Sequence, residues 1–311
     1  MQVHRDIQNL PAFRNAVITI GTFDGVHTGH QQILNQLKTE ASLVKGETVV
    51  VTFHPHPKMV VSSPGHQIFV LNTLEEKIKL LSRHGIDHLV VIPFTTSFAE
   101  QPAQAYIKDF LVAHFHPHTI IIGYDHRFGK NRQGDYHLLE DEAASNNYIV
   151  KEIPEHVLKD VTISSTRIRN ALGIGDINTA NEFLGYDYFF SGLVTEGNKL
   201  GRTIAYPTAN ISIHDEHKLI PGNGVYAVEV GLPGASAHAR LKGMMNIGVR
   251  PTIGGTKRVI EVNIFDFAQD IYGSMITICM KEHLRNEQKF NSLDELKVQL
   301  KKDKEDALKS F

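Results

Sequence analysis

The first half of the chain alternates short apolar runs with segments of helical periodicity. Between the runs, apolar residues recur every three or four positions or good helix formers dominate, as in HQQILNQLKTEASL and LEEKIKLLSRHG. This alternation predicts βαβ units around a mostly parallel sheet, whose ligands bind beyond the carboxyl ends of the strands. The predicted strands are residues 17–20, 49–53, 89–92, 119–123 and 148–153.

The pattern changes near residue 184. Short β-rich runs then follow one another with glycine turns and little helix, which predicts a small antiparallel barrel or sandwich. The tail at 292–311 has the spacing of an amphipathic helix. At 311 residues the chain is long enough for two domains, which we expect at 1–184 and 185–311.

Composition limits which kinds of partner the protein can have and indicates the cellular compartment. The net charge is 32 − 34 = −2, whereas a dedicated nucleic-acid binder would show a basic surface, so we expect no nucleic-acid partner. Cys279 is the single cysteine, which excludes an intrachain disulfide and suits a reducing cytosol. No signal peptide or bilayer-length apolar run is evident, so we expect a cytoplasmic protein without a membrane partner. The oligomeric state is left open.

The stretch GTFDGVHTGH, residues 21–30, joins an apolar run to the start of a helix. A strand, a glycine-rich turn and a helix N-terminus together present backbone N–H groups and a helix dipole to a phosphate. His27 and His30 lie at the helix start. This combination indicates nucleotide chemistry, although GxxxxGK[ST] and GxGxxG motifs are both absent.

Two further motifs follow predicted strands. TFHPHP comes after ETVVV, and its His54 and His56 could also be read as a metal clip, but the prolines add no ligands. GYDHRFGKNRQGD comes after HTIII and carries basic side chains that could neutralise phosphates, or could form a solvated loop. The 18 histidines are scattered and make no zinc signature.

These motifs carry a resemblance. GTFDGVHTGH, TFHPHP, GYDHRFGKNRQGD and ISSTRIR resemble the motifs of the bacterial riboflavin kinase/FMN adenylyltransferase family, whose first domain is a Rossmann-like nucleotidyltransferase with a parallel sheet. The resemblance implies adenylyl transfer from ATP to FMN. The FMN phosphate is already anionic, so the reaction needs charge stabilisation more than a general base.

The resemblance also implies roles for residues of the first half. His27, His30 and Arg167 are the expected catalytic residues. Asp24 could hold metal or orient the turn, and His126 stands where the family usually has phenylalanine. The expected ATP-binding residues here are Gly21, Thr22, Phe23, Asp24, Gly29, Ser164, Thr166 and Arg169, and the expected flavin-binding residues are His56, Asp125 and Phe128.

The second half is similar to riboflavin kinase, a β-barrel with a C-terminal helix, through GRTIAYPTANI, PGNGVYAVEV, NIGVRPTIGG and EVNIFDFAQDIYG. A ribityl alcohol is a poor nucleophile, so a carboxylate must accept its proton. The resemblance assigns this role to Glu261, assigns Mg²⁺ to Thr208 and Asn210, and places Gly201 and Arg202 over the nucleotide phosphates. Asn263 replaces the usual histidine.

The sequence therefore predicts a bifunctional enzyme with riboflavin, FMN, FAD, ATP and ADP as its substrates and products, and Mg²⁺ as its cofactor. A nucleotidyltransferase with another acceptor, such as pantetheine phosphate or nicotinamide mononucleotide, would leave the second half unexplained. A flavin or nucleotide sensor without turnover would not need the retained His27, His30, Arg167, Thr208, Asn210 and Glu261.

Overall fold

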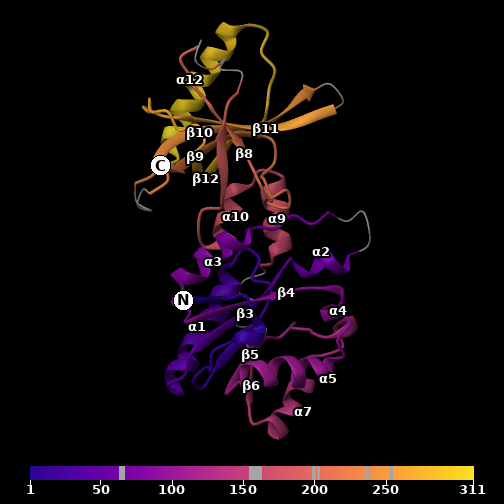
Figure 1. Cartoon of the computed structure of the whole chain (residues 1–311). Helices are drawn as coiled ribbons and strands as arrows, with labels where there is room; N and C mark the ends of the chain where they lie inside the picture. Colours follow the sequence, from indigo (N-terminus) through magenta and orange to yellow (C-terminus); the bar gives the residue numbers. More distant parts are fainter. Residues whose placement is uncertain (63–66, 154–162, 198–200, 202–203, 235–238, 253–254) are drawn as a thin grey trace. The chain divides into compact units, whose positions relative to one another are not determined.

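The computed structural model describes residues 1–62, 67–153, 163–197, 201, 204–234, 239–252 and 255–311, with only backbone features at 250–252 and 255–257. The chain divides into two compact units, Met1–Ser164 and Ser165–Phe311 (Figure 1). Each unit has its own sheet and its own core, as the change of pattern near residue 184 predicts.

The first unit is built on a six-stranded parallel sheet of order β1-β4-β3-β2-β5-β6. Central strands of such a sheet are covered on both faces, which explains why all four residues of β2 are apolar or threonine and buried. The strands are β1 (Gln2–His4), β2 (Val17–Ile20), β3 (Thr48–His54), β4 (His88–Pro93), β5 (Thr119–Gly123) and β6 (Ile149–Ile153).

Helices connect these strands. The longest is α1, whose side chains at Leu34, Leu37 and Ala41 are buried at helical spacing. A π-helical segment, Tyr106–Val112, interrupts the run between α5 and α6. The helices are α1 (Thr28–Leu43), α2 (Pro57–Val61), α3 (Leu74–Arg83), α4 (Thr96–Ala99), α5 (Ala103–Ala105), α6 (Ala113–Phe115) and α7 (Tyr136–Asn146).

The strand order decides where the site lies. β2 pairs with β3 on one side and with β5 on the other, all in parallel. The turn after β2 is therefore flanked by TFHPHP at the end of β3 and by GYDHRFG after β5. The three motifs meet at one edge of the sheet, as the carboxyl-end rule predicts.

The second unit is a closed antiparallel barrel of order β10-β11-β8-β7-β12-β9. Buried residues alternate with half-exposed ones along β7, where Phe190, Gly192 and Val194 point inward. The barrel strands are β7 (Phe189–Thr195), β8 (Ala209–Ser212), β9 (Gly224–Gly231), β10 (Leu241–Thr252), β11 (Gly255–Ile264) and β12 (Met275–Arg285).

Two helices precede the barrel in the chain and pack on it. They are α9 (Ser165–Gly173) and α10 (Ile177–Leu184). The amide of Gly222 donates to the Leu172 carbonyl at 2.8 Å, and Asn181 Nδ2 donates to the Met280 carbonyl at 2.9 Å. By contacts the second unit thus begins at Ser165. The expected domain boundary between residues 184 and 185 stays a prediction.

Helix α12 (Leu293–Lys309) confirms the predicted helical tail. Leu293 and Val298 are exposed, whereas Asp303 and Ala307 are buried. Arg285 on β12 pairs with Asp303 through two nitrogens at 2.8 and 2.7 Å, so a buried carboxylate anchors the helix to the barrel. Figure 1 shows α12 beside the barrel strands.

Candidate active sites

The turn GTFDGVHTGH adopts a conformation suited to an anion. Phe23, Gly25 and Val26 have positive φ angles of 46°, 90° and 38°. Positive φ is unfavourable for phenylalanine and valine, and such backbone is typical of functional turns. Gly21 donates its amide to the Val51 carbonyl at 3.0 Å, which fixes the start of the turn to β3. The turn leads directly into α1, whose N-terminus favours negative charge.

His27 and His30 lie together at the start of α1. Their rings stack with centroids 3.7 Å apart and an interplanar angle of 15°. His27 caps the helix, because its Nδ1 accepts the His30 amide at 3.4 Å. A Cβ on Gly29 would approach that Nδ1 to 3.3 Å, so glycine leaves room for the imidazole.

Burial is the main cause that lowers the pKa of His30 well below its usual value, and His27 and Lys77 lower it further. His30 is therefore neutral near pH 7. Its Nδ1 is buried and has no hydrogen-bond partner within the described ranges. The expected stabilisation of charge at His30 would thus come from a neutral N–H donor, not from an imidazolium.

Asp24 is nearly inaccessible, with 1% of its surface exposed. Its Oδ1 accepts the amides of Leu71 and Asn72 at 2.9 and 3.4 Å. Of the two roles expected for Asp24, these bonds support orientation of the turn.

The residues expected to contact flavin lie in the flanking motifs, and the structure gives two of them a local function as well. His56 caps α2, since its Nδ1 accepts the Lys58 amide at 3.2 Å. Phe128 is buried and stacks on Tyr106 with ring centroids 4.9 Å apart. Asp125 is exposed. Their contact with flavin remains a prediction.

His126 stands at the family's usual phenylalanine position. Burial is the main cause that lowers its pKa to about 4, so the ring is neutral near pH 7. An uncharged, mostly enclosed ring is a smaller departure from phenylalanine than a cationic histidine would be.

ISSTRIR, residues 163–169, spans the start of α9. Ser164 precedes the helix, Thr166 and Arg167 are exposed, and Arg169 is half-exposed. Ser165 onward belongs to the second unit by contacts, whereas His27 and His30 belong to the first. The joint action of Arg167 or Arg169 with the histidines is therefore a prediction.

In the barrel, strand register brings Glu261 beside Asn210. Glu261 on β11 pairs with Asn210 on β8, and its other neighbour is Asn246 on β10. Asn210 in turn pairs with Thr195 on β7. Paired residues of adjacent strands share a face, so the row Thr195, Asn210, Glu261 and Asn246 forms a polar band, here called the polar row.

Backbone groups of neighbouring segments pack closely against residues in and next to the polar row. A Cβ on Gly197 would lie 2.0 Å from Asn210 Nδ2, so the amide side chain occupies space that only glycine leaves free. Asn263, two residues after Glu261, donates to the Pro207 carbonyl at 2.7 Å. This bond ties β11 to the residue just before Thr208.

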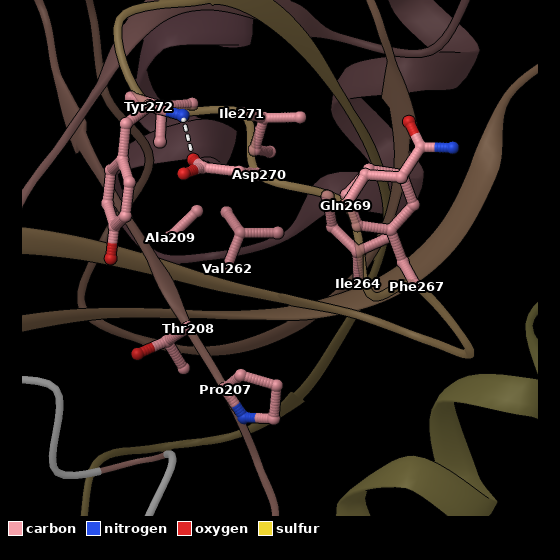
Figure 2. Close-up of a pocket in the computed structure, with 11 residues that line it drawn as sticks. Pro207, Thr208, Ala209, Val262, Ile264, Phe267, Gln269, Asp270, Ile271 and Tyr272 are labelled. Atoms are coloured by element: carbon pink, nitrogen blue, oxygen red, sulfur yellow. Dashed lines mark hydrogen bonds between the residues drawn. The ribbon is translucent and has the colours of Figure 1, made fainter.

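A small cavity of about 80 Å³ lies on the other face of the same strands (Figure 2). Ala209 and Val262, which pair in register, both line it. Thr208 and Pro207 border it, and the amide of Tyr272 donates to Asp270 at 3.0 Å across from them. Thr208 precedes β8 at the border of the cavity, and in an extended chain it is expected to share a side with Asn210, two residues further on, which lies with Glu261.

Gly201 is held close to the segment that leads into Thr208. Its carbonyl accepts the Tyr206 amide at 2.8 Å, and a Cβ would lie 2.1 Å from the Tyr206 carbonyl oxygen. The expected phosphate contact of Arg202 lies outside the described residues.

Gly201→Ala should therefore displace the segment before Thr208 and lower kcat/KM for riboflavin phosphorylation about tenfold or more. Steady-state kinetics with ATP as the varied substrate measures this. Gly231→Ala on β9 is the matched control, because its Cβ would meet only ordinary contacts at 3.8 Å. Equal kinetics for the two variants would show that close approach at Gly201 is unimportant.

Sequence reasoning assigned no role to two residues of these sites. Asn246 lies in the polar row, and Lys77 on α3 reaches the turn after β2. Asn246 is a polar residue inside the apolar run MMNIGV, and Lys77 falls in the apolar stripe of α3 between Leu74 and Leu81. A polar residue at an otherwise apolar position was therefore the sequence signal that could have identified both residues.

Comparison with known families agrees with both halves. The FAD synthetase family model matches residues 10–167, and the riboflavin kinase family model matches residues 184–311. Fold and site together therefore define a two-part, ATP-dependent enzyme of flavin cofactor synthesis.

The relatives share this organisation over their full length. The bifunctional riboflavin kinase/FMN adenylyltransferase of Haemophilus influenzae is 39% identical, over 100% of this chain and 99% of that protein. The Escherichia coli K12 enzyme is 37% identical over 100% and 98%, and the Bacillus subtilis enzyme 36% over 95% and 92%. The chain belongs to the bifunctional riboflavin kinase/FMN adenylyltransferase family. It phosphorylates riboflavin to FMN and adenylylates FMN to FAD, using ATP.

A solved structure has the same fold throughout. It is described as a macrolide-efflux protein from Streptococcus pneumoniae, is 31% identical, and covers 98% of this chain and 97% of its own with a TM-score of 0.85. In the part of this chain that the structure describes, no helix has both the length and the apolarity to cross a bilayer.

Proposed function

We propose that the polar row of the barrel is the riboflavin kinase site and that the turn after β2 is the FMN adenylyltransferase site. The observation that carries the kinase assignment is the register of Glu261 with Asn210. It places a carboxylate and a neutral oxygen ligand side by side on rigid strands, although the two residues are far apart in the sequence.

In the kinase reaction, Glu261 accepts the proton of the ribityl hydroxyl as its oxygen attacks the γ-phosphorus of ATP, and the bond to ADP breaks. The cavity beside Thr208 takes part of the nucleotide. Its walls combine aliphatic side chains with the Tyr272 ring, which suits a flat heteroaromatic group.

In the adenylyltransferase reaction, an FMN phosphate oxygen attacks the α-phosphorus of ATP and pyrophosphate leaves. The strained turn and the N-terminus of α1 bind phosphates through backbone N–H groups. His30 donates a neutral hydrogen bond to the developing charge, and Arg167 or Arg169 contributes a cation from α9. His56, Asp125 and Phe128 form the flavin side.

The donors of the barrel fit Mg²⁺. Thr208 and Asn210 offer hard hydroxyl and amide oxygens, and Mg²⁺ keeps water and phosphate as its remaining ligands. When bound, the ion would neutralise charge on the transferred phosphate. We propose cytoplasmic action on small molecules, without nucleic-acid or membrane partners.

Asn210→Ala should raise the Mg²⁺ concentration for half-maximal riboflavin phosphorylation about ten- to a hundredfold, because one ligand or its support is lost. The Mg²⁺ dependence of FMN adenylylation should not change. Titration of Mg²⁺ at fixed ATP measures both. Asn291→Ala in an exposed loop is the control, and an unchanged Mg²⁺ curve for Asn210→Ala would refute the ligand role.

A further inference from the structure

A buried ammonium group lies against the turn after β2. Lys77 on α3 has only 6% of its surface exposed. Its Nζ donates to the Thr22 carbonyl at 2.6 Å and to Thr52 Oγ1 at 3.4 Å. Thr52 Oγ1 donates to the same carbonyl at 3.2 Å. Lysine is rarely buried without such partners, since losing hydration of the charge is costly.

Hydrogen bonds join the turn and the α3 region through one side chain from each. The Asp24 carboxylate, on the turn, accepts the amides of Leu71 and Asn72 just before α3. The Lys77 ammonium, on α3, donates back to the turn. The two clamps bracket Phe23, whose φ of 46° is unfavourable for a phenylalanine and must be held by its surroundings.

The contact with the Thr22 carbonyl also sets the direction of an amide. The peptide between Thr22 and Phe23 is planar, so its N–H points opposite to its C=O. With the carbonyl directed to Lys77 and Thr52, the Phe23 N–H is directed away from them. Backbone N–H groups of such a turn are the donors that bind phosphate.

We propose that Lys77 is a positioning residue for adenylyl transfer: it fixes the Thr22–Phe23 peptide and so keeps the turn shaped for ATP before ATP binds. This rests on the proposed placement of adenylyl transfer at the turn. Lys77 acts through backbone atoms, with no contact to the nucleotide, and preorganisation of this kind lowers the cost of binding.

The protonation state of Lys77 matters for this role, because the charged ammonium group is the donor to the Thr22 carbonyl. Burial lowers the pKa of Lys77 to about 8, while Asp24 on the turn opposes the shift. Among the described residues, His30 on α1 also interacts with Lys77, which helps to keep the His30 pKa low. Below about pH 8 Lys77 is charged, and above it the proton is lost. The value of kcat/KM for adenylylation should therefore fall on the alkaline side, where substrate phosphates, with pKa about 6, no longer titrate.

The test uses the full-length protein with Lys77→Met, Lys77→Arg and, as matched control on the exposed side of the same helix, Lys79→Met. Lys77→Met should lower kcat/KM for ATP in FMN adenylylation about ten- to a hundredfold. Lys77→Arg should restore most of the activity and move the alkaline fall to higher pH, because arginine stays charged. Riboflavin phosphorylation, measured on the same samples, should not change.

Wild-type adenylylation kinetics in Lys77→Met would overturn the proposal. So would equal losses in Lys77→Met and Lys77→Arg with the alkaline fall unmoved, since that shows a packing role only. If Lys77→Met does not fold, the pH profile of Lys77→Arg decides alone. His30→Ala distinguishes failure of the proposed site from failure of the positioning role. Wild-type adenylylation in His30→Ala would refute the site at the turn. Loss of adenylylation in His30→Ala, together with normal activity in the Lys77 variants, would refute only the positioning role.

Discussion

Glu261→Gln is expected to lower riboflavin phosphorylation about 10²- to 10⁴-fold, the range that a general base contributes. Glutamine keeps the size of the side chain and its place beside Asn210, but it cannot accept the ribityl proton. The effect should fall on kcat more than on KM. Initial rates with riboflavin and ATP measure it.

FMN adenylylation by the same Glu261→Gln protein is the internal control and should keep its wild-type rate. Glu216→Gln, which removes an exposed carboxylate from the same unit, should leave both activities intact. Loss of both activities in Glu261→Gln would point to misfolding or domain coupling, and an unimpaired kinase would remove Glu261 from the base role.

His30→Ala is expected to lower FMN adenylylation about 10²- to 10³-fold, the typical cost of removing one preorganised donor from a site of developing charge. The imidazole stacks on His27 and its pKa lies well below its usual value, so in the proposed site it would donate as a neutral ring. Because His30 is already uncharged at pH 7, adenylylation should show no titration of this group between pH 7 and 8. Initial rates with FMN and ATP measure the loss.

The kinase rate of His30→Ala reports on folding and should match the wild type. His137→Ala is a second control, because that imidazole is 82% exposed on α7. Undiminished adenylylation in His30→Ala would contradict the proposed role of the start of α1.

The sequence predicted the parallel sheet well because its central strands are buried on both faces and are therefore continuously apolar. β2 and β5 begin and end where the predicted strands do, and the other three predicted strands differ by no more than one residue at either end. The edge strand β1 was missed. Its residues Gln2 and Val3 are exposed, so no apolar run marks it.

The barrel was predicted as an architecture, but the polar row was not. Alternation along β11 separates Glu261 from Val262, yet only the register between strands shows that Asn210 and Asn246 are the neighbours of Glu261. Register depends on non-local pairing, which one sequence does not encode in any short pattern.

Lys77 shows a second limit. The segment LEEKIKLLSRHG contains two lysines, of which Lys77 is buried and Lys79 is exposed because they lie on different faces of the helix. Lys77 lies at helical spacing between Leu74 and Leu81, so the 3.6-residue period places it on the apolar face of the helix. The partner carbonyl of Thr22, on another element, could not be deduced from it.

A time course shows directly whether one chain carries both activities. The purified full-length protein is incubated with riboflavin, ATP and Mg²⁺, and riboflavin, FMN and FAD are separated by chromatography at intervals. Two active halves in one chain predict that FMN appears first and FAD follows, and that added FMN is converted to FAD without riboflavin. Absence of FMN, together with failure of added FMN to yield FAD, would contradict a bifunctional enzyme and favour a flavin or nucleotide sensor without turnover.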